Sequence, residues 1–188
     1  QYMTQISQYI DGHRDEMLLF WKDLVNFQAG SRETDRIEAL LRRTMGRLEE
    51  EGLDCRLIPS GGVPVLLATD GARRSGRPIF LCGHLDTVFP DGTYPEAPFT
   101  IQDGVARGPG VLDMKGGVAM MVYMIKALRH IGFDRCCCAA TRRSATTGPV
   151  PPRSSSRRRR AANTPLTWRL GGWTAVCLWG ERGAWTAG

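Results

Sequence analysis

The feature that most constrains the fold is the stretch RPIFLCGHLD, in which a short apolar run leads directly into a histidine and an aspartate. Residues Ile79 to Cys82 are all apolar, so a strand built from them would be apolar on both faces. Strands of that kind belong in the buried centre of a sheet that helices cover. His84 and Asp86 follow at alternate positions, so their side chains share one face just beyond the strand. The stretch therefore predicts an α/β sheet with polar chemistry at one strand end.

The segments around this strand alternate between helical and extended patterns. Apolar residues at near-helical spacing predict helices over residues 4–27, 31–52 and 115–131, the second of them capped by Ser31. Short apolar runs bounded by turn residues predict two more strands, in LDCRLIP and VPVLLATD. The methionines Met120, Met121 and Met124 are interpreted as core packing on the third helix. Alternating helices and buried strands indicate a layered α/β fold.

A second motif, GPGVLDMKGG, comes directly before the third predicted helix. Gly108 and Gly110 flank a proline and predict a tight turn, after which Asp113 precedes the helix. The motif differs from the dinucleotide-binding pattern G-x-G-x-x-G, because Asp113 replaces the third glycine and its carboxylate would repel a pyrophosphate. A carboxylate at this place instead suits a pair of metal ions, which one carboxylate can bridge.

His84 and Asp86 allow two interpretations. A neutral imidazole is a good metal ligand and usually donates its other ring N–H to a carboxylate, a role that Asp86 could fill for His84. The alternative is an ordinary hydrogen-bonded pair at the end of a strand. The second motif favours the metal site, because it adds a carboxylate, Asp113, at the start of a helix.

The stretches GHLDTVFP and APFTIQDGVARGPGVLDMKGG, with the helix that follows, resemble the co-catalytic zinc exopeptidases of metallopeptidase family M20. These include glutamate carboxypeptidase, aminoacylase, acetylornithine deacetylase and succinyl-diaminopimelate desuccinylase. The residues of the two stretches are most similar to those of the glutamate carboxypeptidases. The resemblance covers residues 5 to 134. It implies a three-layer, zinc-exopeptidase-like α/β catalytic domain, whose N-terminal part is residues 1–134. It also implies hydrolysis of the amide bond of a peptide C-terminal residue or an N-acyl amino acid, with two zinc or cobalt ions, by an enzyme that is a homodimer in intact relatives.

The same resemblance implies roles for three residues. His84 binds one ion, Asp113 bridges both, and Asp86, counted as catalytic, orients His84; the peptide bond after Asp113 is expected to be cis. The family's general base, a glutamate of a Glu-Glu pair, and its remaining ligands have no counterpart here, because after Asp134 the chain holds one acid, Glu181, and no histidine. We therefore expect an incomplete metal site and an inactive 188-residue chain.

The composition of the chain changes abruptly at Arg135. From there on it holds ten arginines, no lysine and a single acid, whereas the first 134 residues carry more acids than bases. The segment contains four of the six cysteines and four of the five tryptophans, but no Ile, Phe, Tyr, Met or His. No class of folded or disordered segment favours this combination. We predict that residues 135–188 form no domain and are a disordered tail in a displaced reading frame, which makes the chain a truncated form.

The codons offer support for this frameshift hypothesis. The peptide ATRRSA, residues 140–145, can be encoded GCG-ACG-AGG-AGA-TCG-GC. Reading from the third base gives Asp-Glu-Glu-Ile-Gly, which contains the Glu-Glu pair that the resemblance requires. The same shift applied to GERG, residues 180–183, permits Arg-Lys-Gly, a further hallmark of the family. A small deletion near Arg135 would explain why the Glu-Glu pair arrives early.

The net charge of +6 belongs wholly to this tail. The alternative function is therefore a non-catalytic protein whose Arg-rich tail, with its run Arg157 to Arg160, binds nucleic acid or a protein partner. No apolar run reaches the length of a membrane span, and the two cysteines before Arg135 fit a reducing compartment. We expect a cytoplasmic protein whose partner is a peptide or N-acyl amino acid substrate, with no nucleic acid and no membrane.

Overall fold

The computed structural model describes residues 2–60, 63–69 and 79–133 with their side chains, and the backbone of residues 137–142, 166–170 and 173–177. The chain divides into two units, Gln1–Gly148 and Pro149–Gly188. The first unit contains, in chain order, α1 (Tyr2–Gly12), α2 (Arg14–Asn26), α3 (Thr34–Glu50), β1 (Asp54–Ile58), β2 (Val65–Thr69), β3 (Ile79–His84), β4 (Thr100–Gln102), β5 (Val105–Arg107), the wide turn η1 (Val111–Gly116), α4 (Gly117–His130) and β6 (Cys137–Arg142).

The second unit contains an antiparallel pair of strands, β7 (Leu166–Leu170) and β8 (Trp173–Cys177). These strands and β6 fall within the segment for which the sequence predicts a disordered tail, and the remainder of that segment lies outside the described residues. The division predicted at residue 134 stays a prediction. Across the described residues, no helix combines the length and the apolar character that crossing a membrane requires.

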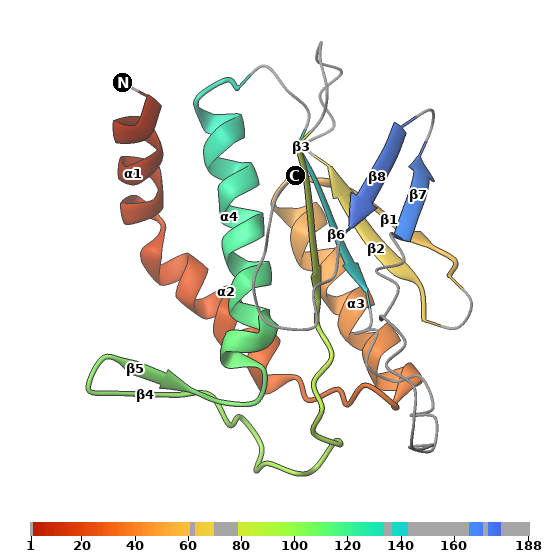
Figure 1. The fold of residues 1–188 in the computed structure, drawn as a ribbon. Coiled ribbons are helices and arrows are strands. Elements are labelled where there is room, and N and C mark those ends of the chain that lie inside the picture. Colours follow the sequence, from red (N-terminus) through yellow and green to blue (C-terminus); the bar gives the residue numbers. More distant parts are fainter. Residues whose placement is uncertain are drawn as a thin grey trace, which may run out of the picture. The chain divides into compact units, whose positions relative to one another are not determined.

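A four-stranded sheet forms the centre of the first unit (Figure 1). The strand order is β1-β2-β6-β3, in which β2 runs antiparallel to both β1 and β6, while β3 runs parallel to β6. In this register His84, the last residue of β3, lies opposite position 142, the last residue of β6. The three strands predicted from the sequence are therefore all present, at LDCRLIP, VPVLLATD and RPIFLCGH.

The environment of β3 differs from the prediction. Residues 79–82 are half-buried rather than fully buried, and among the described strands β3 lies at one edge of the sheet. An edge strand has a hydrogen-bonded neighbour on one side only, so its apolar side chains are covered less completely than those of a central strand. Gly83 and His84, at the end of β3, are buried.

One face of the sheet carries the core. Cys55, Ala68 and Leu81 come from different strands but align on this face, because Cys55 lies opposite Ala68, and Ala68 and Leu81 lie opposite the same residue of β6. Buried side chains of α2, α3 and α4 pack into the same cluster. The described residues thus supply a sheet and a helical layer, two of the three layers that the family resemblance implies.

The helix predicted over residues 4–27 is two helices, α1 and α2, that meet at a bend (Figure 1). His13 has φ −115° and ψ 17°, which is outside the helical region. Its ring stacks on Tyr9 with 4.0 Å between the centroids, and its Nδ1 bonds the Tyr9 carbonyl at 2.7 Å. Gly12, a poor helix former, precedes the bend. Periodicity alone could not reveal this break, because both helices keep the apolar spacing.

Two other helix predictions are corrected by the structure. Ser31 does not cap α3, which begins at Thr34; its hydroxyl instead donates a hydrogen bond to the Thr87 carbonyl at 2.9 Å. Of the three methionines interpreted as core, Met121 is buried, whereas Met120 and Met124 are 57% and 45% exposed. The last two are four residues apart and therefore share one face of α4, which in the described structure points away from the core.

Candidate metal centre

The two sequence motifs meet at the end of β3. His84 is brought there by the buried end of the strand, and Asp113 by the turn η1, 29 residues later. The His84 Nε2 atom lies 3.1 Å from Asp113 Oδ1. His84 is largely buried, whereas the side chain of Asp113 is 86% exposed. The pair therefore forms a corner with one buried donor atom and one that solvent can reach.

Asp86 lies on the opposite side of the imidazole. The His84 Nδ1 atom is 3.0 Å from the Asp86 backbone oxygen and 3.4 Å from its Oδ1, and Asp86 is fully buried. With a proton on Nδ1 to donate to Asp86, the neutral ring leaves the lone pair of Nε2 facing Asp113. This is the tautomer that a metal ligand needs.

The charges around the ring act on its protonation. Burial lowers the pKa of His84, but the hydrogen bond and negative charge of Asp86, followed by the charge of Asp113, outweigh burial and leave that pKa above its ordinary value. Two carboxylates thus favour positive charge at this corner. An imidazolium satisfies that preference, and so would a metal cation, which would displace the proton from Nε2.

Glycines allow the turn η1 to approach its neighbours closely. Gly110 has φ +71°, a conformation that L side chains rarely adopt, and a Cβ there would lie 2.8 Å from Thr87 Cγ2. At Gly116 a Cβ would lie 2.6 Å from the Val111 carbonyl oxygen. The peptide bond between Asp113 and Met114 is cis, as the family resemblance implies. The motif GPGVLDMKGG therefore folds as a tight support for Asp113.

The chain after Asp86 is fastened to the segment that joins α2 to α3. Thr87 donates its N–H to the Ala29 carbonyl at 2.9 Å and accepts the Ser31 N–H at 2.8 Å. Further along, the Glu33 carboxylate accepts the N–H groups of Gly30 and Asp91 at 2.8 and 3.0 Å. These bonds hold the residues that follow His84 and Asp86 against a second part of the chain.

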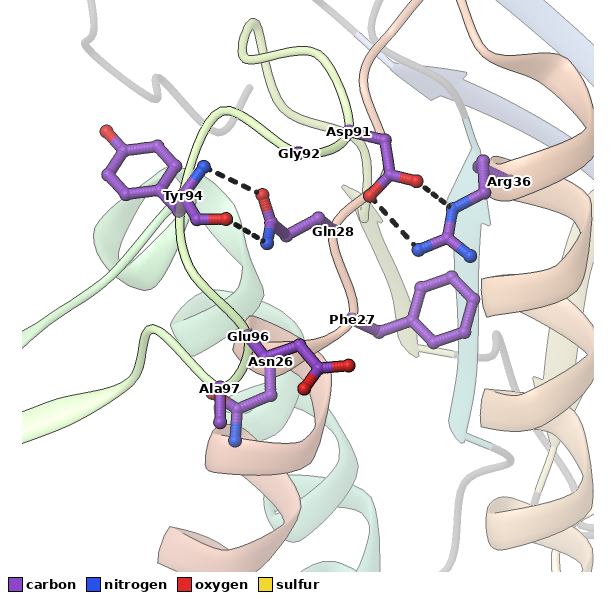
Figure 2. Close-up of a pocket in the computed structure, with 9 residues that line it drawn as sticks. All are labelled: Asn26, Phe27, Gln28, Arg36, Asp91, Gly92, Tyr94, Glu96 and Ala97. Carbon is purple, nitrogen blue, oxygen red and sulfur yellow. Dashed lines mark hydrogen bonds and ion pairs between the residues drawn. The ribbon is translucent and has the colours of Figure 1, made fainter.

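Figure 2 shows the outer part of this attachment, around a hollow of about 420 Å³. The Gln28 side chain donates to the Tyr94 carbonyl at 3.0 Å and accepts the Tyr94 N–H at 3.2 Å. Arg36 pairs with Asp91 at 3.0 Å and lies over the ring of Phe27, 4.6 Å from its centroid. None of the residues that line this hollow belongs to the His84 corner, so we interpret the hollow as part of the attachment of the loop.

The donor atoms at the corner fit one divalent ion. Zinc bonds of 2.0–2.2 Å in tetrahedral geometry would separate a nitrogen and an oxygen ligand by about 3.3–3.6 Å, slightly more than the 3.1 Å between His84 Nε2 and Asp113 Oδ1. The same contact is also an ordinary ion pair in the absence of metal. Among the residues with described side chains, no group of three or more His, Cys, Asp or Glu could hold an ion. The corner is therefore a partial site.

Sequence reasoning missed Lys115 as a residue of this region. Its position, two residues after Asp113 and before two glycines, predicts only the start of a helix. In the structure Lys115 is fully buried, and its Nζ donates to the Phe27 carbonyl at 2.8 Å. The signal was a charged residue within a motif whose glycines require close packing on both sides.

Comparison with known proteins identifies relatives of the N-terminal part of the chain. Residues 80–136 match the model of the family described as Peptidase family M20/M25/M40. Carboxypeptidase G2 of Pseudomonas sp. (strain RS-16) is 32% identical over 111 residues, which cover 58% of this chain and 27% of that protein. Succinyl-diaminopimelate desuccinylase 2 of Ruegeria sp. (strain TM1040) is 37% identical over 122 residues, which cover 62% and 30%. The chain thus spans less than a third of either relative.

Solved structures show the same fold. The M20 family metallo-carboxypeptidase Sso-CP2 from Sulfolobus solfataricus superposes with a TM-score of 0.58 at 20% sequence identity, over 68% of this chain and 30% of that one. The matched residues of the family model contain His84, Asp86 and Asp113, and they end one residue after Arg135, where the composition changes. The α/β fold expected from the motifs is confirmed for this part of the chain.

Proposed function

From the premise that the N-terminal part of this chain belongs to peptidase family M20, we propose that it derives from a metal-dependent hydrolase. Its substrates are peptides with a cleavable C-terminal residue or N-acyl amino acids. The observation that carries the proposal is the 3.1 Å approach of His84 Nε2 to Asp113 Oδ1 within the region that matches the family. The names of the two relatives, a carboxypeptidase and a desuccinylase, support this substrate class.

The residues of the corner have separate tasks in this function. His84 and Asp113 would hold divalent ions, zinc or cobalt, which activate water and polarise an amide carbonyl. Asp86 holds the Nδ1 proton of His84, so that Nε2 remains free to bind. The exposed Asp113 carboxylate has a second oxygen to offer to a second ion. The cytoplasm is the proposed location, based on the two cysteines before Arg135.

The chain as it stands lacks the residue that would take a proton from water. After Asp134 it contains one acid and no histidine, so we propose that the 188-residue chain is inactive. The register of the sheet supports a displaced reading frame as the cause. His84 lies opposite position 142, and the displaced frame would read Glu-Glu at positions 142 and 143. Two carboxylates would then follow the strand beside the proposed ligands.

Sequencing the gene across the codons for residues 133–147 tests the frame directly. We expect an insertion or deletion there relative to intact relatives; an undisturbed frame would overturn the frameshift proposal. A protein made from the corrected frame tests the function. It should release C-terminal glutamate or an acyl group in a zinc- or cobalt-dependent reaction, which His84→Ala and Asp113→Ala abolish.

Two controls sharpen the functional test. His130→Ala removes an imidazole from the last turn of α4 and should leave turnover unchanged, because His130 has no part in the corner. The 188-residue chain should bind no stoichiometric pair of zinc ions in calorimetric titration and should show no zinc-dependent turnover. Turnover by the 188-residue chain would contradict the proposal that this chain is inactive. A protein from the corrected frame that folds but binds no metal would contradict the proposed function.

A further inference from the structure

A short segment between α2 and α3, residues 29–31, pairs with Thr87, the residue that follows Asp86. Thr87 donates its N–H to the Ala29 carbonyl at 2.9 Å, and the Thr87 carbonyl accepts the Ser31 N–H at 2.8 Å. The Ser31 hydroxyl donates to the same carbonyl at 2.9 Å. Ala29, Ser31 and Thr87 are all buried, so these bonds lie in a low-dielectric interior, where hydrogen bonds are stronger than in water. We call residues 29–31 the strap.

The strap is connected to His84 through a single peptide group, the one between Asp86 and Thr87. Its N–H belongs to Thr87 and donates to the Ala29 carbonyl at 2.9 Å. Its carbonyl oxygen belongs to Asp86 and lies 3.0 Å from His84 Nδ1. A peptide group is planar, so its N–H and its C=O point in fixed, opposite directions. Holding the N–H against the strap therefore fixes the oxygen that faces the imidazole.

The side chain of Thr87 faces the second sequence motif. A Cβ added at Gly110 would lie 2.8 Å from Thr87 Cγ2, so these two residues are packed closely together. Gly110 directly precedes the turn η1, which carries Asp113. Thr87 thus contacts the strap through its backbone and the start of the turn through its methyl group. A displacement of Thr87 would disturb both sides of the corner.

We propose that the strap positions the imidazole of His84, with Ser31 as the positioning residue. The N–H and hydroxyl of Ser31 hold the Thr87 carbonyl, and the adjoining peptide group keeps the Asp86 oxygen directed at Nδ1. The Nδ1 proton then stays bonded to that oxygen while Nε2 faces Asp113. Ser31 acts through the backbone rather than on a metal or a substrate. The importance of this arrangement for catalysis rests on the proposed function, but the arrangement itself requires no metal.

The test is hydrogen exchange, followed by proton–nitrogen NMR of the full 188-residue chain without metal. At pH 5.5, below the ordinary pKa of histidine, both ring nitrogens carry a proton. The His84 signals are assigned by their absence in His84→Ala. Two exchange rates are measured, that of the His84 Nδ1–H and that of the Thr87 amide, and both should be slow because both groups are bonded inside the protein. A wild-type Nδ1–H that exchanges as freely as that of the exposed His130 would overturn the proposal.

Two substitutions loosen the strap in different ways. Ser31→Ala removes one of the two bonds to the Thr87 carbonyl and should speed both exchange rates about fivefold, the effect of one buried hydrogen bond. Gly30→Ala would place a Cβ 2.9 Å from the Phe89 carbonyl oxygen and 3.0 Å from Pro90 Cα. It should therefore push the strap away from Thr87 and speed both rates further. Should Gly30→Ala fail to fold, Ser31→Ala decides.

Thr44→Val is the matched control. Thr44 is also buried, and its hydroxyl donates to the Leu40 carbonyl at 2.8 Å, within α3. This variant should lower the overall stability but leave both rates within about twofold of wild type, because local opening of the strap does not break its bond. The proposal is overturned if Ser31→Ala speeds the Thr87 amide but not the Nδ1–H, if it speeds neither, or if Thr44→Val speeds both as much. Absence of zinc binding or of amide hydrolysis would count against the proposed function alone.

Discussion

At the scale of the residue, the turn beneath Asp113 depends on a close contact that only a glycine can make. Gly116 has ordinary helical dihedrals, with φ −64° and ψ −41°, so it is not required by its backbone conformation. It is required by space, since a Cβ would lie 2.6 Å from a backbone oxygen and 3.2 Å from the Trp21 indole nitrogen. The turn beneath Asp113 and α2 come together at this point.

We therefore predict opposite effects for two glycine substitutions. Gly116→Ala should destabilise the chain by at least about 2 kcal/mol, because the clash is with backbone and cannot be relieved by a rotamer change. Gly46→Ala, in the middle of α3 with nothing within 4 Å of the added methyl, should stabilise it by roughly 0.5–1 kcal/mol. Thermal unfolding followed by circular dichroism measures both. Equal effects of the two changes would contradict this account of η1.

At the scale of the elements, the helices are joined by a partly buried charge cluster. Lys126 on α4 binds Glu16 of α2 at 3.1 Å and Glu51, just after α3, at 2.7 Å. Burial tends to lower the pKa of Lys126, but its bonds to the two glutamates outweigh burial and raise it. For Glu16 burial acts to raise the pKa, and the bond and charge of Lys126 outweigh that effect and lower it. One lysine thus links the packing of three helices.

Lys126→Met should cost about 1–2 kcal/mol at pH 7, because two partly buried carboxylates lose their shared partner. The cost should depend on pH. A lowered carboxyl pKa contributes stability that is present above its ordinary value near 4.5 and is lost as the pH falls through the lower folded value. Urea unfolding curves of the wild type and variant should therefore converge on acidification below pH 4.5. A difference that stays constant down to pH 2.5 would show that the cluster does not act through charge.

The element scale also shows the limits of periodicity. Apolar spacing correctly predicts the locations of the helical segments and of three strands, because burial imposes its period on the sequence. It did not reveal the bend at His13, whose ring stacks on Tyr9, nor the hydrogen bond of Ser31 to Thr87. These contacts are made by particular side chains, and Thr87 is 56 residues from Ser31. A pattern along one segment carries no information about such a partner.

At the scale of the whole molecule, the chain joins an acidic N-terminal part, related to known peptidases, to a basic segment of different composition. The family match ends at residue 136, and ten arginines follow from Arg135 onward. The displaced frame that we propose would account for both facts. The competing function, binding of nucleic acid or a partner by the basic segment, involves residues that lie mostly outside the described part of the chain.

We predict that any binding of the full chain to duplex DNA is weak and electrostatic. Affinity should fall steeply with salt and disappear by about 200 mM, because each arginine that contacts a phosphate releases a counterion. Gel-shift titrations at two salt concentrations measure this, with a variant in which Arg157 to Arg160 are replaced by serine as the control. Tight binding that survives the higher salt concentration and requires those arginines would restore the alternative function.

The sequence by itself determined the chemistry that is available to this protein. A strand period places His84 and Asp86 on one face, and the glycines around Asp113 require a tight turn, so the residue types and their order predict a metal site at this corner. Only the tertiary structure decided that His84 and Asp113 meet at 3.1 Å, and that Lys115 is buried against Phe27, 88 residues away. Such distances follow from the packing of segments that are remote along the chain, which local spacing does not encode.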